Sequence, residues 1–264
     1  MGSERKIIFF DIDGTIVDNK TKRISDSTVE GIKRARDNGH LCFINTGRTG
    51  CLIEPSLTDK ITFDGFLLGC GTMVVYRGKV LLHRTLTRKM SADILRFLAE
   101  HHIDAILEGS RENFYMRREE IYSDKFREYT EYYRDRNYSY FESALGKYDK
   151  LFAYAAHPSD MELFKKEYGD RLSFIDRENG YYEILPKGYS KATAIQFIVG
   201  RLNIPMECTA AIGDSNNDIP MLECVHTAIA MGNSSKSVLD IADFVTGSAA
   251  EDGIWEALKW LGVI

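Results

Sequence analysis

The chain has 264 residues, of which 44% are hydrophobic and 28% charged, a composition typical of an ordinary globular protein. Its net charge of -5 gives no general attraction to nucleic acid or to anionic lipid, so neither is an expected partner. The five cysteines are widely spaced and include no C-x-x-C pair, which argues against a disulfide framework or a zinc site. Since the N-terminal part has no signal-peptide pattern and no stretch long enough to span a bilayer, we expect a cytoplasmic protein.

Short apolar runs alternate with helical segments from residue 5 to about residue 82. Residues 7–10 form a candidate buried strand, and residues 25–38 carry apolar side chains at helical spacing. Ser27 and Glu30 are spaced as a capping box for this helix, and Gly39 supplies its end. The other expected elements here are strands at 41–44 and 66–68, a short helix near Leu52, and strands at 73–76 and 80–82 joined by a turn at 77–79.

The same alternation returns after about residue 187. Ser190 is a candidate cap for a helix that carries apolar residues to Leu202. Further elements are expected as strands at 209–212, 227–230 and 244–245, and as helices after Asn216, near Val238 and at 251–261. Strands that alternate with helices predict an α/β fold in which the two flanks form one doubly wound, Rossmann-like parallel sheet.

Residues 83–186 differ from these flanks in their sequence pattern and predict a smaller α+β domain inserted between them. Residues 111–150 contain eight tyrosines, nine basic and nine acidic side chains, so this segment is locally neutral. Equal numbers of acids would repel phosphate, which favours a solvated amphipathic helix over a nucleic-acid site. We therefore expect a core domain of residues 1–82 and 187–264 and an insert of residues 83–186.

Asp11 and Asp13 follow directly on the first expected strand. Residues two apart in an extended chain point the same way, so two carboxylates converge at one strand end. Such a pair needs a cation between its members or a proton on one of them, and both solutions suit phosphoryl transfer. A calcium loop is the alternative, but its sixth and twelfth positions would be Ile16 and Lys22 instead of Gly and Glu.

A second carboxylate cluster occupies residues 213–218, again after an apolar run. It places Asp214 at the same edge of the sheet, where open α/β sheets bind ligands. Hard oxygen donors from few carboxylates indicate magnesium and not zinc. Asn217 and Asp218 lie at a helix start, where simple capping is the alternative explanation.

Two further segments offer groups that bind phosphate. Thr46, Gly47 and Arg48 bring a hydroxyl, a backbone amide and a cation to the end of a strand. Lys191 lies just inside a helix N-terminus, where its charge opposes the helix dipole. This placement indicates an anion to neutralise, and an ordinary surface lysine is the alternative.

These four segments, in this order, resemble the motifs of the haloacid dehalogenase superfamily, and within it the Cof-like phosphatases, which have a type IIB cap between the second and third motifs. D-x-D-G-T matches residues 11–15, the second-motif threonine matches Thr46, the third-motif lysine matches Lys191, and G-D-x-x-N-D matches residues 213–218. The resemblance spans nearly the whole chain. It implies that the insert is a cap that governs substrate specificity.

The resemblance also implies a role for each matched residue. Asp11 is then the nucleophile and Asp13 the general acid and base. Magnesium is bound by Asp11, the backbone carbonyl of Asp13, and Asp214. The residues expected around phosphate are Thr46, Gly47, Lys191 and Asn217, with Asp218 as a supporting acid.

One departure from the family pattern is Cys70-Gly71-Thr72, where relatives commonly have N-G-A. It lies near the expected active-site edge and outside the four motifs. Arg48 and Glu183 are candidate substrate contacts, and a structural salt bridge is the alternative for each. The oligomeric state stays open between a monomer and a weak dimer.

The matched set predicts a magnesium-dependent phosphomonoester hydrolase that acts on a small phosphorylated metabolite, such as a sugar phosphate, through an aspartyl-phosphate on Asp11. Two alternatives remain open. A phosphomutase would use the same carboxylates and return the phosphoryl group to the substrate instead of to water. A non-catalytic sensor would only bind a phosphorylated ligand, and Asp13 argues against it because binding alone needs no proton donor.

Overall fold

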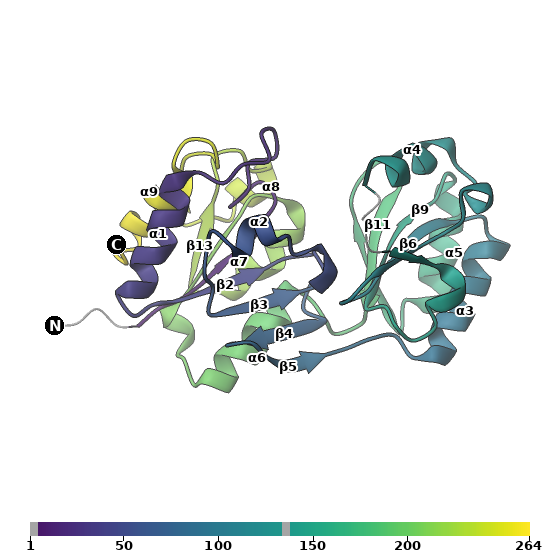
Figure 1. The fold of residues 1–264 in the computed structure, drawn as a ribbon, viewed down its shortest axis with the longest axis horizontal. Coiled ribbons are helices and arrows are strands. Elements are labelled where there is room, and N and C mark those ends of the chain that lie inside the picture. Colours follow the sequence, from purple (N-terminus) through teal and green to yellow (C-terminus); the bar gives the residue numbers. More distant parts are fainter. Residues whose placement is uncertain (1–4, 134–137) are drawn as a thin grey trace. The chain divides into compact units, whose positions relative to one another are not determined.

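The computed structural model of the chain describes residues 5–133 and 138–264. Residues 1–4, at the start of the expected core domain, and residues 134–137, inside the expected insert, lie outside the described residues. The chain forms two compact units (Figure 1). Unit 1 comprises Met1–Arg48, Ile53–Leu82 and Ser190–Ile264, and unit 2 comprises Thr49–Leu52 and His83–Tyr189.

Unit 1 is built on a sheet that has eight strands among the described residues, in the order β14-β13-β12-β1-β2-β3-β4-β5. The strands from β14 to β3 are parallel to their neighbours, and β4 is antiparallel to β3. The strands are β1 (Ile7–Phe10), β2 (Leu41–Asn45), β3 (Gly65–Leu68), β4 (Met73–Tyr76), β5 (Lys79–His83), β12 (Thr209–Gly213), β13 (Thr227–Ala230) and β14 (Phe244–Val245).

Helices cover both faces of this sheet (Figure 1). They are α1 (Asp26–Asp37), α2 (Pro55–Thr58), α6 (Lys191–Leu202), α7 (Ile219–Cys224), α8 (Lys236–Leu239) and α9 (Gly253–Trp260), with short 3-10 helices η4 (Met206–Cys208) and η5 (Asn216–Asp218). Ser190 caps α6 as predicted, since its hydroxyl accepts a hydrogen bond from the backbone N–H of Thr193. The predicted α/β class is confirmed.

The predicted capping box of α1 is wrong. Ser25 has the extended backbone of a cap, and its hydroxyl accepts a hydrogen bond from the N–H of Thr28 at 3.2 Å. Ser27 already lies inside the first turn and donates to Asp252. Glu30 is ion-paired with Arg34 one turn later instead of turning back to the cap. The helix therefore starts two residues earlier than the capping-box pattern indicated.

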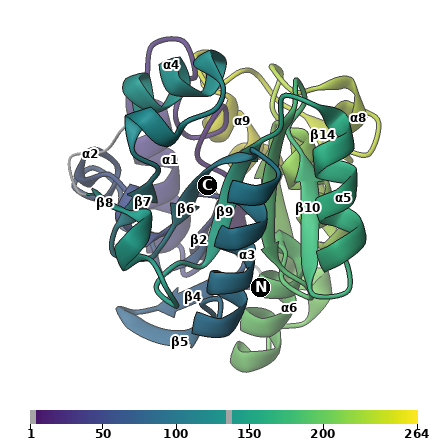
Figure 2. The same ribbon diagram turned by 90° about the vertical axis from the view of Figure 1, so that its right-hand side faces the viewer.

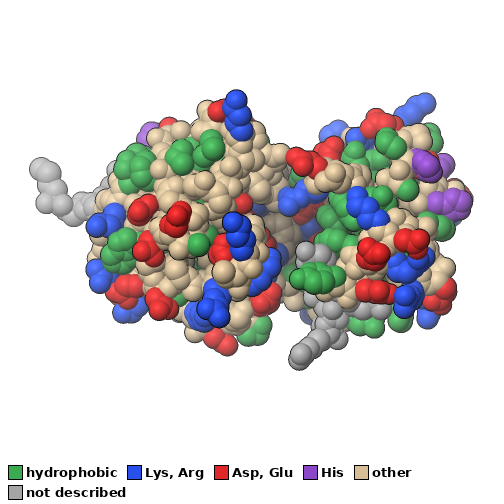
Figure 3. Space-filling model, turned by 90° about the horizontal axis from the view of Figure 1, so that it is seen from above, with side chains coloured by type: hydrophobic (Ala, Val, Ile, Leu, Met, Phe, Trp, Pro, Cys, Tyr) green, Lys and Arg blue, Asp and Glu red, His purple; other side chains and the backbone are tan. Residues whose placement is uncertain are grey.

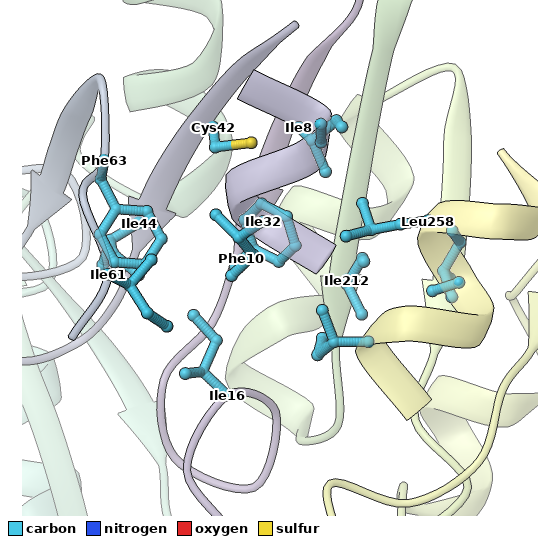
Figure 4. Packing of buried hydrophobic residues seen from close by; sticks show 14 of the residues in the cluster. Ile8, Phe10, Ile16, Ile32, Cys42, Ile44, Ile61, Phe63, Ile212 and Leu258 are labelled. Atoms are coloured by element: carbon cyan, nitrogen blue, oxygen red, sulfur yellow. The ribbon is translucent and has the colours of Figure 1, made fainter. Parts of the chain in front are cut away.

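The central strand β1 is buried on both faces. Ile8 and Phe10 pack in a cluster with Ile32 of α1 and Leu258 of α9 (Figure 4). Ile7 and Phe9 point to the opposite face and pack in the cluster that includes α6 and α7. Alternate side chains of one strand thus enter two cores, so a one-residue slip would misplace every contact. This packing fixes the position of the residue that follows the strand, Asp11.

Unit 2 contains a sheet of six strands within the described part of the chain, in the order β10-β11-β9-β6-β7-β8. The strands are β6 (Asp104–Glu108), β7 (Asn113–Tyr115), β8 (Tyr138–Tyr140), β9 (Lys150–Tyr154), β10 (Leu172–Asp176) and β11 (Tyr181–Pro186). The helices are α3 (Arg88–Glu100), α4 (Asp124–Tyr133) and α5 (Pro158–Tyr168), with 3-10 helices η1 (Gly50–Leu52), η2 (Arg118–Glu120) and η3 (Phe141–Ser143). Helices α3 and α5 pack on one face of this sheet (Figure 2), and Phe126 of α4 packs with Ile106 on the other.

Acidic and basic side chains are interspersed on the face shown in Figure 3, and neither sign gathers into one patch there. No helix within the described residues is both long enough and apolar enough to span a membrane.

Candidate active site

Three adjacent parallel strands of unit 1 end at one edge of the sheet. Phe10, the last residue of β1, is in register with residues near the ends of β12 and β2. The polar residues that directly follow these strands therefore come to the same edge; they are Asp11, Asp214 and Thr46. This is the edge at which open α/β sheets bind ligands.

Lys191 connects two acids at this edge. Its Nζ donates hydrogen bonds to Oδ1 of Asp11 at 2.7 Å and to Oδ1 of Asp218 at 2.5 Å. The exposed fractions of Lys191, Asp11 and Asp218 are 1%, 4% and 0%. The alternative of an ordinary surface lysine is therefore excluded, because the ammonium is enclosed with its partners.

The acids of this cluster repel one another. Burial and the charge of Asp218 raise the pKa of Asp11 to about 8, against the opposing effect of Lys191. Burial and Asp218 likewise raise the pKa of Asp214 to about 7, against a hydrogen bond from Thr15. Burial alone would lower the pKa of Lys191, but the charges of Asp11 and Asp218 outweigh it and raise that pKa. One lysine does not balance three acids, so the cluster favours an additional cation.

The donor atoms fit a hard divalent cation. Carboxylate oxygens of Asp11, Asp214 and Asp218 lie within 4.8 Å of one another. All are hard oxygen donors, which magnesium prefers. Gly14 leaves room for this group, because a Cβ at its position would lie 2.2 Å from Oδ2 of Asp214 and its φ of +85° disfavours other residues. Thr15 orients the site by donating to Oδ1 of Asp214 at 3.1 Å.

Asp13 is bound by Arg48. Nε of Arg48 donates to Oδ2 of Asp13 at 2.9 Å and Nη2 donates to Oδ1 at 2.6 Å, so both carboxylate oxygens are engaged. Nη1 of the same arginine faces Oε1 of Glu54 at 3.4 Å. Burial would raise the pKa of Asp13, but the hydrogen bonds and charge of Arg48 lower it overall. The sequence left Arg48 open between a substrate contact and a structural salt bridge, and the structure has the salt bridge, with Asp13.

Thr46 is buried at the end of β2, and the partly exposed Gly47 follows it. The hydroxyl of Thr46 accepts a hydrogen bond from the N–H of Arg48 at 3.2 Å, and the carbonyl of Thr46 accepts one from the N–H of Cys70 at 3.0 Å. Cys70 has φ of +53°, a left-handed conformation that asparagine adopts more readily than cysteine. At this departure from N-G-A, Cys70 therefore has a backbone conformation that would suit the asparagine of the family pattern better.

Asp218 and Asn217 differ in what they contact. Oδ2 of Asp218 accepts hydrogen bonds from the N–H groups of Asp214 and Ser215, each at 3.0 Å, while Oδ1 binds Lys191. Asp218 therefore ties the loop after β12 to the lysine. Oδ1 of Asn217 instead accepts a hydrogen bond from the hydroxyl of Ser215 at 2.6 Å, a local contact within the turn.

Glu183 lies in β11 of unit 2 and is paired with Lys150. The same ammonium contacts Glu108. Lys150 of β9 therefore lies between two glutamates that belong to the strands on either side of it, β6 and β11. The side chains of Lys150 and Glu183 are 4% and 6% exposed. The structural salt bridge that the sequence left open for Glu183 is therefore present.

Three polar residues around the site were not singled out from the sequence. Thr15 donates to Asp214 and is the last residue of the D-x-D-G-T motif. Its place in the motif could have identified it as a site residue. Nδ2 of the buried Asn45 donates to the backbone carbonyl of Lys191 at 3.1 Å and anchors the start of α6. Glu54 has no pattern in the sequence that indicates its contact with Arg48.

Comparison with known proteins identifies the family of the chain. A profile of haloacid dehalogenase-like hydrolases matches residues 8–258. The chain is 32% identical to "Putative phosphatase YkrA" of Bacillus subtilis (strain 168), over 99% of either chain. Among solved structures, BT1666 from Bacteroides thetaiotaomicron, a phosphatase of the HAD enzyme superfamily, is 25% identical with a TM-score of 0.85 over 98% of this chain and 96% of its own. The HAD subclass IIB sugar phosphatase BT4131 is 25% identical with a TM-score of 0.83 over 98% and 100%.

The fold, the site and these matches define a hydrolytic enzyme of the phosphatase class. The chain belongs to the haloacid dehalogenase-like hydrolase family, and its predicted resemblance to Cof-like, subclass IIB phosphatases is confirmed.

Proposed function

We propose that this enzyme is a magnesium-dependent phosphomonoester hydrolase that acts on a small phosphorylated metabolite such as a sugar phosphate. The observation that carries the proposal is the buried contact of Lys191 with Asp11 and Asp218, next to Asp214. The sugar phosphatase activity in the name of a full-length structural neighbour supports the substrate class.

In the first step of the proposed reaction, Asp11 is the nucleophile. One oxygen of its carboxylate bonds to phosphorus while the ester P–O bond breaks, which gives an aspartyl-phosphate. The leaving oxygen takes a proton from Asp13. Lys191 lies against Asp11 and offsets the negative charge that the phosphoryl oxygens bring to the site.

In the second step, water attacks phosphorus and gives its proton to Asp13. The bond between phosphorus and Asp11 breaks, inorganic phosphate leaves, and both aspartates return to their starting states. Asp13 thus acts first as an acid and then as a base.

The remaining site residues bind phosphate and metal in this proposal. Asp11, Asp214 and the backbone carbonyl of Asp13 hold magnesium, which when bound supplies positive charge against the carboxylates and the phosphoryl group. Asp218 acts through Lys191 and the loop of Asp214. The proposed phosphate contacts are Thr46, Gly47, Lys191 and Asn217.

Unit 2 is the proposed cap that selects the substrate, since lids of this kind exclude water and determine which substrate reacts. We assign neither Arg48 nor Glu183 to the substrate. Arg48 is already paired with Asp13, and Glu183 is already paired with Lys150.

The test is turnover of an aryl phosphate with and without magnesium. Activity is expected with magnesium, and excess chelator and the Asp11→Asn variant should each abolish it. Asp59→Asn, at an exposed position after α2, is the matched control and should keep wild-type activity. Normal turnover by Asp11→Asn would contradict the mechanism, and a panel of sugar phosphates, nucleotides and cofactor phosphates then defines the substrate.

A further inference from the structure

A buried asparagine ends β2, in the core of unit 1. Asn45 is 0% exposed, and the alternation of the strand places its side chain on the same face as Leu41 and Phe43. These two residues belong to the apolar cluster between the sheet and helices α6 and α7, as does Leu67, which is opposite Asn45 on β3. An amide thus lies among apolar side chains.

The amide nitrogen of Asn45 contacts both helices. Nδ2 donates a hydrogen bond to the backbone carbonyl of Lys191 at 3.1 Å and lies 3.5 Å from Sδ of Met221 in α7. Only the NH2 end of an amide can face a carbonyl, so this bond fixes the orientation of the side chain. No group in the described part of the chain donates a hydrogen bond to Oδ1.

Stability alone would favour an apolar residue at position 45. A buried amide that is only partly paired costs stability, and leucine has a similar size and needs no partner. The carbonyl of Lys191 would not be orphaned by the change, because the first residue of a helix also accepts the N–H four residues later. A residue that departs from the pattern of a core in this way indicates a role in the site.

The bond from Asn45 holds Lys191 at the end opposite its charge. The ammonium is bound by Asp11 at 2.7 Å and by Asp218 at 2.5 Å. Asn45 binds the backbone of the same lysine, and Thr46 follows Asn45 by one peptide bond. One buried side chain therefore connects two groups proposed to bind phosphate, across 146 positions of sequence.

The proposed reaction changes the contacts of the ammonium but not this bond. Formation of the aspartyl-phosphate removes the charge of the Asp11 carboxylate, which weakens the attraction between Asp11 and Lys191. The hydrogen bond from Asn45 to the backbone of Lys191 joins two uncharged groups and stays the same. It can therefore keep the lysine in place while the charge moves from the carboxylate to the phosphoryl oxygens.

We propose that Asn45 is a positioning residue that holds the backbone of Lys191 at a fixed distance from Thr46. This role rests on the proposed function, in which both residues contact the phosphoryl group. All of the groups involved belong to unit 1. Loss of the bond should affect the transition state more than the bound substrate, because the phosphoryl group changes shape between them and only correct placement matches both.

Kinetics of Asn45→Leu on an aryl phosphate test this role. The variant should lower kcat roughly tenfold and leave KM within about twofold, since misplacement by about an ångström is enough for such a loss. Met221→Leu is the matched control and should keep wild-type kcat. It changes the other neighbour of the amide, conserves volume, and leaves the bond to Lys191 in place.

Urea unfolding of the same proteins separates positioning from simple support of the fold. The unfolding midpoint of Asn45→Leu should be no lower than that of the wild type, although kcat falls. A midpoint that falls together with kcat, or an unchanged kcat, overturns the inference. Asn45→Ala also lacks the amide and gives the kinetic readout if Asn45→Leu does not fold.

A readout without turnover keeps this role distinct from the proposed function. The ammonium resonance of Lys191, assigned by its disappearance in Lys191→Arg, should shift in Asn45→Leu and in Asn45→Ala and stay in place in Met221→Leu. An unchanged resonance in the Asn45 variants overturns the inference whatever the kinetics. If the wild type hydrolyses no phosphate ester, the proposed function fails, and this resonance alone decides whether Asn45 positions Lys191.

Discussion

Asp11 and Lys191 are 180 residues apart in the sequence and are joined by a buried hydrogen bond of 2.7 Å. Burial and the repulsion of neighbouring acids raise the pKa values of Asp11 and Asp214 in this cluster. The charge of Lys191 therefore supports both the nucleophile and the fold around it, and removal of the charge should affect both.

Lys191→Met should lower the free energy of unfolding by about 3–5 kcal/mol, because loss of one partner leaves buried charges uncompensated. Turnover should fall to background. The double variant Lys191→Met with Asp218→Asn removes one of the repelling acids and should recover part of the stability but no activity. Lys166→Met, at an exposed position of α5, is the control for chemical denaturation. Equal stability of Lys191→Met and the control would contradict the prediction.

Asp214→Asn should have opposite effects on stability with and without metal. In chelator, the variant should melt at a higher temperature than the wild type, because one buried acid of the cluster is gone. Added magnesium should raise the melting temperature of the wild type, since it binds the folded state, and should have little effect on the variant. Thermal unfolding over a magnesium titration measures both, and an equal magnesium response of the two proteins would exclude Asp214 as a ligand.

Glu183→Gln distinguishes a structural role from substrate binding. Loss of one of the two charged partners of Lys150 should lower stability by roughly 1.5–3 kcal/mol, as for a buried hydrogen bond to a charged group. KM for the best substrate of the panel should stay unchanged. A large rise in KM at unchanged stability would instead identify Glu183 as a substrate contact.

The pair of His83 and Asp149 in unit 2 predicts a pH-dependent contribution to stability. The hydrogen bond that His83 donates to the Asp149 carboxylate, together with the charge of Asp149, raises the pKa of His83 above 6.5, against the effect of burial. A histidine with a raised folded pKa contributes stability that is fully present below the unfolded value and is lost as pH rises through the folded value.

His83→Gln should therefore cost more stability at pH 5.5 than at pH 8.5, by about 1 kcal/mol after allowance for the partly exposed ring. His157→Gln, at an exposed position that makes no side-chain cap for α5, is the control. Urea unfolding at both pH values measures the difference. A cost that is equal or larger at high pH would refute the raised pKa.

Much of the fold and of the cluster could be predicted because parallel strands impose a simple rule. Asp11 and Asp214 each follow a short apolar run, and the carboxyl ends of neighbouring parallel strands meet at one edge. Ser190 could be recognised as a cap, and this fixed the start of the helix that carries Lys191. The first inference depends on the pattern of apolar runs and the second on the residue type at a helix start, and the sequence expresses both directly.

The pairing of Asp13 with Arg48 could not be predicted in the same way. Periodicity indicates which way a residue points along a strand, but both residues lie beyond the strand ends, where side-chain directions depend on the loops. The assignment of residues 49–52 to unit 2 was equally hidden, because a four-residue segment has no pattern of its own. The cap of α1 was misjudged because two serines two residues apart both satisfy a local rule, and only the backbone at Ser25 is extended.

The assignment of residues 49–52 to unit 2 also determines how this unit can be exchanged between relatives. A graft of the contiguous segment 83–189 alone would leave residues 49–52 of the recipient against a foreign β6–β7 hairpin, with Gly50 and Cys51 matched to the wrong partners. A chimera should therefore carry residues 49–52 together with the larger segment. Changes of substrate range that proceed by wholesale replacement of unit 2 require two separated pieces of sequence to change together.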